Sequence, residues 1–551
     1  METLKTSLEM LYHWELTTPD KLFMRQPIDG QWKEFTWKQA AHEVRSLAAI
    51  LKSYNLEPNS KVALVSKNCA HWIISDLAIM MAGHVSVPVY PNVNADTLNY
   101  VLKHSESKIL LVGKLDDWNF MKAGVPEGVQ CISFPWYGPK QEGFHYWEEL
   151  AKQHKPLIGF PNRSLDDIMT IIYTSGTTGN PKGVVHTFRA FAWAVATGKA
   201  VFDLKDGQDK LFSYLPLSHI AERMLIEMAG VYCNFEISFA ESLDLFVANL
   251  AQAKPTIFLG VPRIWTKFQM GILAKLPQSR LNILLSIPVI NNIIRKKIKT
   301  GLGLQNCRHY FSGAAPISPS LVRWWQKLGV DIEEVYAMTE NCAISHVNKK
   351  PDFKIGTQGK PMPGVEIKFS EAGEILVKVP CNMVGYNKEP EMTAATLKDG
   401  WLHTGDMGKE DEDGFLKITG RVKEIFKTDK GKYVAPAPIE MKISKNYLIE
   451  QICVVGSSLP QPIGLVVLSV DGRTKDRDYL KESLSKTLEI INPELEKHER
   501  IQKLVVLKED WTIENGLLTP TMKIKRNPIE DKYSPHYEAW YNHTESIVFE
   551  N

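Results

Sequence analysis

Residues 173–183 carry the side chains best suited to chemistry in this chain, and they read Tyr-Thr-Ser-Gly-Thr-Thr-Gly-Asn-Pro-Lys-Gly. Glycines let backbone N–H groups approach oxygen atoms closely, and successive N–H groups form a concavity that binds anions. The hydroxyl side chains add donors, and Lys182 adds a point charge. The stretch therefore predicts a phosphate-binding loop built from Thr174, Ser175, Gly176, Thr177, Thr178, Gly179 and Lys182.

The same residues exclude a P-loop kinase or NTPase. A Walker A motif needs Gly-x-x-x-x-Gly-Lys followed by Ser or Thr, whereas here Pro181 precedes Lys182 and Gly183 follows it. The alternative is a flexible Gly/Thr surface loop. The apolar run in front of the loop and the lysine within it favour the phosphate-binding interpretation.

The elements that must position this loop come from the apolar patterning. The run 168–173 predicts a buried strand that leads into the loop. Earlier in the chain, strand patterns alternate with helical spacing, at 61–66, 71–83, 85–89, 95–104 and 108–112. This alternation predicts a parallel sheet with helices on its faces. In such folds ligands bind beyond the carboxyl ends of the strands, where the loop lies.

The sequence pattern changes beyond about residue 366, where turns of acidic residues and glycine separate short apolar runs and predict hairpins. A compact α+β pattern follows beyond residue 420. We therefore predict an α/β protein with a large N-terminal domain, residues 1–420, of mixed and parallel sheets flanked by helices. A small α+β C-terminal domain, residues 421–551, completes the chain.

Two later segments place polar groups just after apolar runs. Residues 336–340 read Tyr-Ala-Met-Thr-Glu, which offers an aromatic face for a base and a carboxylate suited to Mg²⁺. Residues 400–406 end in Asp406, a carboxylate past a turn that is placed to accept hydrogen bonds from sugar hydroxyls. Taken singly, each segment is an ordinary turn.

Taken together and in order across about residues 30–530, the motifs resemble the adenylate-forming superfamily, which includes acyl-CoA synthetases, firefly luciferase and the adenylation domains of peptide synthetases. The resemblance implies that the loop holds ATP phosphates and that Tyr336 stacks on adenine. It implies that Thr339 contacts phosphate and that Glu340, with Thr174, holds Mg²⁺. Asp406 and Arg421 are expected to bind ribose, and Arg421 also phosphate.

The resemblance also assigns residues of the small domain. Lys523 matches the catalytic lysine of the family, and a fixed ammonium offsets the negative charge that builds up when a carboxylate attacks phosphate. Lys525 is its nearest rival. Lys423 matches the hinge about which the small domain rotates, and Gly431 lies in the loop that faces CoA. The family usually has glycine where this chain has Ala337 and Met522.

Three segments indicate the substrate. Residues 214–223, which contain His219 in a His-x-x-Glu-Arg arrangement, resemble the acyl-site segment of long-chain fatty acyl-CoA synthetases. Residues 254–265 match the same subgroup, and so do Gly313, Ala314 and Ala315, whose small side chains let a ligand approach the backbone. His219 has the alternative role of a satisfied core histidine.

The implied reaction uses ATP, Mg²⁺ and CoA. A fatty acid carboxylate attacks the α-phosphate of ATP, with Lys182, Lys523 and Glu340 as the catalytic groups, and a thiol then attacks the acyl-adenylate. The acceptor thiol is that of CoA or, as the alternative, that of an acyl carrier protein. Oxidative luciferase-type chemistry is left open, while a non-catalytic regulator would be expected to lack Glu340 or Lys523.

Composition and charge indicate the partners and the cellular location of this protein. The net charge of +2 gives no reason to expect a nucleic-acid partner. The seven cysteines include no C-x-x-C pair, and the N-terminus has no apolar secretory run, so we expect a cytoplasmic protein. The apolar run 281–294, followed by basic residues 295–299, suggests peripheral contact with the inner face of a membrane; the alternative is a buried helix with a solvated basic turn. A homodimer is also left open.

Overall fold

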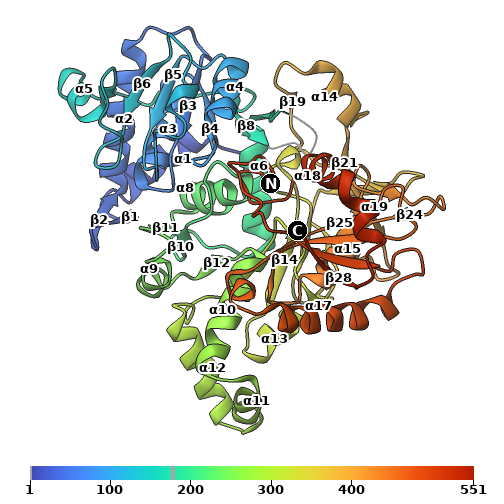
Figure 1. The fold of residues 1–551 in the computed structure, drawn as a ribbon. Coiled ribbons are helices and arrows are strands. Elements are labelled where there is room, and N and C mark those ends of the chain that lie inside the picture. The colour runs from blue at the N-terminus through green and yellow to red at the C-terminus, as the bar shows by residue number, and fades with distance from the viewer. Residues whose placement is uncertain (1–2, 175–179, 551) are drawn as a thin grey trace. The chain divides into compact units, whose positions relative to one another are not determined.

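The computed structural model describes residues 3–174 and 180–550 (Figure 1). The described residues fold into two compact units. The first contains the chain up to Thr174, Asn180–Ile367 and Val377–Leu402, and the second contains Lys368–Leu376 and the chain from His403 onward. The compact units thus divide before the domain boundary predicted at residue 420. Both units combine strands with helices, and the predicted α/β class is confirmed.

The largest sheet of the first unit carries the loop. Its strand order is β19-β9-β8-β4-β3-β5-β6-β7. The strands are β3 (Lys61–Val65), β4 (Val85–Val89), β5 (Ile109–Val112), β6 (Gln130–Ser133), β7 (His145–Tyr146), β8 (Ile168–Thr174), β9 (Lys182–Thr187) and β19 (Gly385–Tyr386). The predicted alternation is confirmed, because β3, β4 and β5 are parallel and α3 (Ala70–Met81) and α4 (Ala95–Ser105) lie between them in the chain.

Two further sheets complete the first unit. One has the order β10-β11-β1-β2, with strands Lys210–Ser213, Glu236–Phe239, Leu22–Ile28 and Gln31–Thr36. The other has the order β12-β13-β14-β15-β16, with strands Ile257–Leu259, His309–Ser312, Ile332–Tyr336, His346–Asn348 and Lys360–Pro361. Because β12, β13 and β14 are parallel, their carboxyl ends share one edge, and the segments that follow them lie close together.

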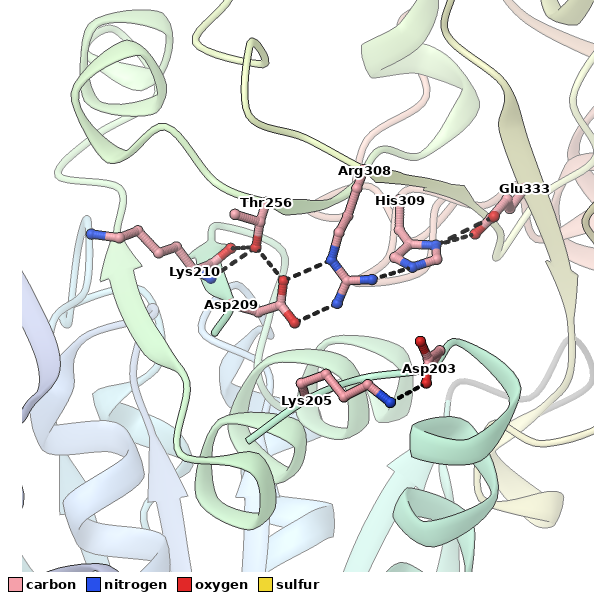
Figure 2. A network of polar contacts seen from close by, with 8 residues as sticks. All are labelled: Asp203, Lys205, Asp209, Lys210, Thr256, Arg308, His309 and Glu333. Atoms are coloured by element: carbon pink, nitrogen blue, oxygen red, sulfur yellow. Dashed lines mark hydrogen bonds and ion pairs between the residues drawn. The ribbon is translucent and has the colours of Figure 1, made fainter. Parts of the chain in front are cut away.

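A polar network ties the amino-terminal ends of these strands (Figure 2). The guanidinium of Arg308 donates to both oxygens of Asp209, at 3.0 and 2.5 Å, and Thr256 Oγ1 donates to Asp209 Oδ1 at 2.6 Å. Asp209 precedes β10, Thr256 precedes β12 and Arg308 precedes β13. The network therefore joins two sheets at the edge opposite the one that carries Tyr336.

Polar side chains cap the amino-terminal ends of several helices in the first unit. Thr6 and Thr36 each accept a backbone N–H at the start of a helix, with Glu9 and Gln39 completing capping boxes. The remaining α-helices are α1 (Ser7–Thr17), α2 (Trp37–Ser53), α5 (Trp147–Gln153), α6 (Phe188–Val201), α7 (Ile220–Glu222), α8 (Ala229–Cys233), α9 (Phe246–Ala253), α10 (Pro262–Lys275), α11 (Gln278–Ser286), α12 (Ile290–Gly301), α13 (Pro319–Lys327) and α14 (Pro390–Thr396). A π-helical turn, η2 (Arg223–Met228), and the 3₁₀ turns η1 (Lys122–Gly124) and η3 (Thr339–Asn341) join them. The run 281–294 is divided between α11 and α12 and does not form one buried helix.

The chain passes between the two units within β17 (Glu366–Phe369), β18 (Glu374–Lys378) and β21 (Trp401–Glu410), and β20 (Leu397–Lys398) precedes β21. The second unit contains the predicted hairpin of β21 with β22 (Leu416–Arg421), and a short pair, β23 (Phe426–Lys427) with β24 (Tyr433–Val434).

The centre of the second unit is a sheet of order β25-β26-β27-β28, with strands Ile449–Val455, Ile463–Leu468, Lys503–Val506 and Ile547–Phe549. Alternate residues of these strands enter different apolar clusters, so both faces of the sheet are covered. The helices are α15 (Pro436–Ile443), α16 (Val470–Arg473), α17 (Arg477–Ile491), α18 (Arg526–Tyr533) and α19 (Tyr537–Tyr541), with 3₁₀ turns η4 (Asn492–Glu494) and η5 (Ser534–His536).

Within residues 3–174 and 180–550, no helix combines the length and the apolar character that crossing a membrane requires.

Candidate active site

The predicted phosphate loop joins β8 to β9, which form an antiparallel hairpin. Thr174, the last residue of β8, is the register partner of Lys182, the first residue of β9. The two therefore flank the loop at the mouth of the hairpin, and both are half-buried. The loop residues Ser175, Gly176, Thr177, Thr178 and Gly179 lie outside the described residues.

Lys182 and Glu340, both predicted to be catalytic, are linked by a residue that sequence reasoning missed. The Lys182 Nζ lies 5.2 Å from the centre of the Tyr386 ring, and the Tyr386 hydroxyl donates to Glu340 Oε1 at 2.7 Å. Burial, and then the Glu340 carboxylate, raise the pKa of Tyr386, so the phenol stays protonated as a donor. Pairing of β19 with β9 holds Tyr386 beside this strand. The sequence signal was only a Gly-Tyr pair, which carries no chemical motif of its own.

Thr339 is fixed by a second residue that the sequence did not reveal. His186, in β9, donates from Nε2 to the Thr339 carbonyl at 2.7 Å. Burial lowers the pKa of His186 to about 4, so the imidazole is neutral and can hold this tautomer. Thr339 and Glu340 are both 8% exposed. The first turn after Met338 is thus anchored to β9 through the Thr339 carbonyl and to β19 through the Glu340 side chain.

Tyr336 ends β14, and its ring is half-buried and 6.0 Å from that of His346. On the neighbouring strand β13, the segment Gly313–Ala315 follows Ser312. A Cβ at Gly313 would lie 3.0 Å from the Val335 carbonyl oxygen, which leaves little space for a side chain. Ala314 and Ala315 are exposed, and Ala314 has a φ of +64°. Tyr336, predicted to stack on adenine, and the Gly313–Ala315 segment, predicted to line the acyl site, therefore lie at the same edge of one sheet.

His219 is half-buried at the start of α7, and its Nδ1 accepts the Ala221 N–H at 3.2 Å. The neighbouring Glu222 is buried and accepts hydrogen bonds from Ser213 Oγ at 3.0 Å and from the Tyr214 N–H at 2.9 Å. Burial raises the pKa of Glu222 to about 8. Glu222, which was not part of the predicted set, thus ties the short helix that begins after His219 to the end of β10.

The site residues of the second unit gather around the β21–β22 hairpin. Asp406 and Arg421 are register partners, and Arg421 Nε donates to Asp406 Oδ1 at 2.7 Å. Asp406 is 9% exposed, whereas the Arg421 side chain is 45% exposed. Lys523 is exposed when the whole residue is considered. Desolvation of its ammonium, and then repulsion from Arg421, lower the pKa of Lys523, while attraction to Asp406 and Glu424 opposes this shift. Asp406, Arg421 and Lys523 are therefore electrostatic neighbours.

Lys523 sits on a tight turn whose geometry would suit the glycine that the family usually has before this lysine. The Lys523 N–H donates to Thr519 Oγ1 at 3.0 Å, and its carbonyl accepts from the Thr519 N–H at 2.8 Å. The preceding Met522 has a φ of +62°, a left-handed conformation that glycine adopts most readily. Three residues beyond Lys523, Arg526 donates to Glu440 at 2.6 Å and to the Val454 carbonyl at 2.7 Å. This buried pair, which the sequence reasoning missed, anchors the turn to the core of the unit.

The predicted hinge and CoA-side loop occupy exposed connections of the second unit. Lys423 is exposed between the end of β22 at Arg421 and the start of β23 at Phe426. Gly431 is exposed at the turn of the β23–β24 hairpin with a φ of +74°, and its N–H donates to the Thr428 carbonyl at 2.9 Å. The roles of both residues stay predictions.

The donor set fits a magnesium nucleotide better than a metal held by protein alone. Among the described residues, no cluster of three or more His, Cys, Asp or Glu side chains could hold a metal ion. Mg²⁺ commonly binds one or two carboxylates together with substrate phosphates and water. Glu340 supplies one such carboxylate close to Lys182, so the residues present fit Mg²⁺ brought in with ATP.

Family models match both parts of the chain. The AMP-binding enzyme model matches residues 11–387, and the model of the AMP-binding enzyme C-terminal domain matches residues 424–545. The chain belongs to the AMP-binding enzyme family. The AMP-binding match ends one residue after Tyr386, and the second match begins one residue after Lys423.

Relatives of this AMP-binding enzyme align with nearly its whole length. The long-chain-fatty-acid–CoA ligase FadD15 of Mycobacterium bovis is 31% identical, over 97% of this chain and 96% of its own length. The long-chain-fatty-acid–CoA ligase ACSBG2 of Xenopus laevis is 28% identical, over 93% of this chain and 80% of its own.

Solved structures share its fold. The anthranilate CoA ligase AuaEII in complex with anthranoyl-AMP superposes with a TM-score of 0.80 at 18% identity, covering 98% of this chain and 99% of that one. The A domain of carboxylic acid reductase from Segniliparus rugosus, with AMP and a carboxylic acid, gives a TM-score of 0.78 at 20% identity, covering 98% and 94%.

Proposed function

We propose that this AMP-binding enzyme activates a long-chain fatty acid with ATP and transfers it to CoA. The carboxylate attacks the α-phosphate, forming acyl-adenylate and releasing pyrophosphate; the CoA thiol then attacks the acyl carbonyl and releases AMP. The observation that carries the proposal is the arrangement of Lys182, Tyr386 and Glu340 at the mouth of the β8–β9 hairpin. Full-length relatives named as long-chain-fatty-acid–CoA ligases support the choice of acid and thiol.

In the first step the side chains mainly position ATP and offset charge. Lys182 and the loop before it hold the β- and γ-phosphates, Thr339 contacts phosphate, and Tyr336 stacks on adenine. Asp406 and Arg421 hold ribose. Lys523 places its ammonium where negative charge builds up on the α-phosphate.

Glu340 and Thr174 would hold Mg²⁺, which when bound neutralises phosphate charge. Tyr386 keeps the Glu340 carboxylate oriented by its hydrogen bond of 2.7 Å. In this role Tyr386 positions another group and has no contact with the reacting atoms.

For the second step we propose rotation of the small domain about Lys423. Lys523 then leaves the acyl-adenylate, and the hairpin that carries Gly431 takes its place on the CoA side. One site would serve two half-reactions in this way. The acid would bind near His219 and the Gly313–Ala315 segment, in which Ala314 and Ala315 are exposed.

ATP–pyrophosphate exchange with acids from acetate to stearate tests this function. We expect exchange with long-chain acids, and then ATP-dependent thioester formation with CoA and little with acyl carrier protein. Absence of exchange with every acid would overturn adenylation. Thioester formed only on the carrier protein would overturn the choice of CoA.

We further propose that the chain works in the cytoplasm and meets its acid at the inner face of a membrane, into which long-chain acids partition. The alternative is that its exposed apolar residues form a homodimer interface. Sedimentation velocity, which detects self-association, distinguishes a homodimer from a monomer that binds membranes.

A further inference from the structure

The charge of this chain is unevenly distributed along its sequence. Residues 245–330 contain no Asp or Glu, and they contain twelve basic residues: Lys254, Arg263, Lys267, Lys275, Arg280, Arg295, Lys296, Lys297, Lys299, Arg308, Arg323 and Lys327. With a net charge of +2 for the whole chain, the rest carries −10. A stretch of this kind creates a local positive field that the overall charge conceals.

These basic side chains face solvent. The structure describes the whole stretch, in which ten of them are exposed and the other two, Arg295 and Lys299, are half-buried. Arg308 pairs with Asp209, which lies outside the stretch (Figure 2). The absence of acidic residues between 245 and 330 means that no such pairing can occur within the stretch itself.

The helices α11 and α12 add an apolar surface to this basic region, and Figure 1 shows them beyond α10. Leu281 is buried, and Leu285, Ile294 and Ile298 pack against the apolar cluster of the first unit. On the other side, Ile283 is 61% exposed, Val289 72% and Ile293 58%. Ile287, between the helices, is 37% exposed. Large apolar side chains exposed together mark an interaction surface.

The exposed apolar groups gather at the connection between the two helices. Ile287 and Val289 lie in this connection, and Ile293 lies in the first turn of α12. Within α12, Ile293 and Lys297 are four residues apart, so they lie on the same side of the helix, and the exposed Lys296 is next to Lys297 in the sequence. The surface is therefore apolar at the connection and basic one turn beyond Ile293.

We propose that the α11–α12 hairpin docks this protein on an anionic lipid bilayer. The isoleucine and valine side chains would enter the boundary between headgroups and acyl chains, and the lysines would remain at the level of the anionic headgroups. Two copies joined symmetrically through this face would bring two strongly basic regions together without acidic partners. A nucleic acid would match the charge but offers no apolar phase for the exposed isoleucines.

The benefit of membrane docking to catalysis rests on the proposed function, but the docking of the α11–α12 hairpin on a bilayer is inferred independently of it. A long-chain acid resides mainly in the membrane, so an enzyme held there meets its substrate at high local concentration.

The test is flotation of the full-length protein with vesicles of phosphatidylcholine alone or with phosphatidylglycerol. We expect binding to the mixed vesicles and weak binding to phosphatidylcholine. Reversal of two charges, Lys296→Glu with Lys297→Glu, should weaken binding to mixed vesicles at least about 25-fold, since each lysine near an anionic surface contributes roughly fivefold. Val289→Ser with Ile293→Ser should weaken it at least about tenfold through lost apolar burial.

Matched controls lie elsewhere on the first unit. Lys152→Glu with Lys155→Glu makes the same change of charge outside the basic stretch, and Ile158→Ser alters an apolar side chain that is 96% exposed. Both controls should bind as the unaltered protein does. All variants should keep ATP–pyrophosphate exchange with a detergent-dispersed acid, so a folding defect or failure of the proposed function shows separately.

Equal binding by hairpin and control variants would overturn the inference, as would absence of binding to mixed vesicles. A hairpin variant that lost self-association in sedimentation velocity while vesicle binding stayed unchanged would assign the face to a second copy of the chain instead.

Discussion

The candidate site residues of the two units differ in how the fold holds them. Lys182, Tyr386 and Glu340 belong to the first unit, where paired strands and the buried Glu340 fix their geometry. Arg421 and Lys523 belong to the second unit and are exposed on a strand end and a turn. In the proposed function, the residues of the first unit act in both steps and benefit from rigid placement, whereas Lys523 acts in the first step alone and is carried on a separate unit.

The largest expected effect concerns Lys523. Lys523→Ala should lower ATP–pyrophosphate exchange by about 10²–10³-fold, because one preorganised donor to developing charge contributes that much. ATP binding, measured by calorimetry, should change little. Lys525→Ala is the control, and a larger loss in that variant would move the catalytic role to Lys525.

The next effect concerns stability in the first unit. The pKa of His186 is lowered to about 4 in the folded protein, so on acidification the unfolded chain takes up a proton near pH 6.5 while the folded one does not. The stabilisation is complete above pH 6.5 and should fall by about 3 kcal/mol as pH drops from 6.5 to 4. His186→Gln keeps a donor for Thr339 and should weaken this pH dependence in urea unfolding. The same change at exposed His145 should not; equal behaviour of the two variants would contradict the assignment.

A smaller effect is expected at Tyr386. Tyr386→Phe removes the hydrogen bond to the Glu340 carboxylate and keeps the ring beside Lys182, so kcat should fall about tenfold to a hundredfold. Because Tyr386 acts by positioning Glu340, the Mg²⁺ concentration for half-maximal activity should rise. Tyr447→Phe, in the second unit, is the control. An unchanged Mg²⁺ requirement would argue against this positioning role.

The smallest effect tests the turn that carries Lys523. Met522→Val puts a β-branched side chain at a φ of +62° and should lower the free energy of unfolding by about 1–2 kcal/mol. Met522→Gly should relieve strain and change stability by less than about 1 kcal/mol, since the glycine entropy cost opposes the relief. Greater destabilisation by glycine than by valine would rule out the left-handed turn.

Much of this fold could be predicted from local pattern. The β3–α3–β4–α4–β5 alternation and the β21–β22 hairpin follow from apolar periodicity and acidic-Gly turns, which are properties of neighbouring residues. The resemblance placed Lys182, Glu340 and Lys523. Tyr386, His186 and Arg526 could not be predicted, because each acts on a residue 46 or more positions away along the chain and depends on which strands pair or pack.

Sequence also left the run 281–294 ambiguous, since a short apolar run fits a buried helix as well as an exposed one. Only the packing shows that Leu281 faces the core while Ile283 and Ile293 face solvent.

The central claim is that one enzyme carries out two half-reactions with different residues of its second unit. The most direct measurement compares Lys523→Ala and Gly431→Val in pyrophosphate exchange and in thioester formation from supplied acyl-adenylate and CoA. We predict that Lys523→Ala loses exchange and keeps thioester formation, and that Gly431→Val, strained at a φ of +74°, does the reverse. Equal loss of both half-reactions in each variant would contradict the account.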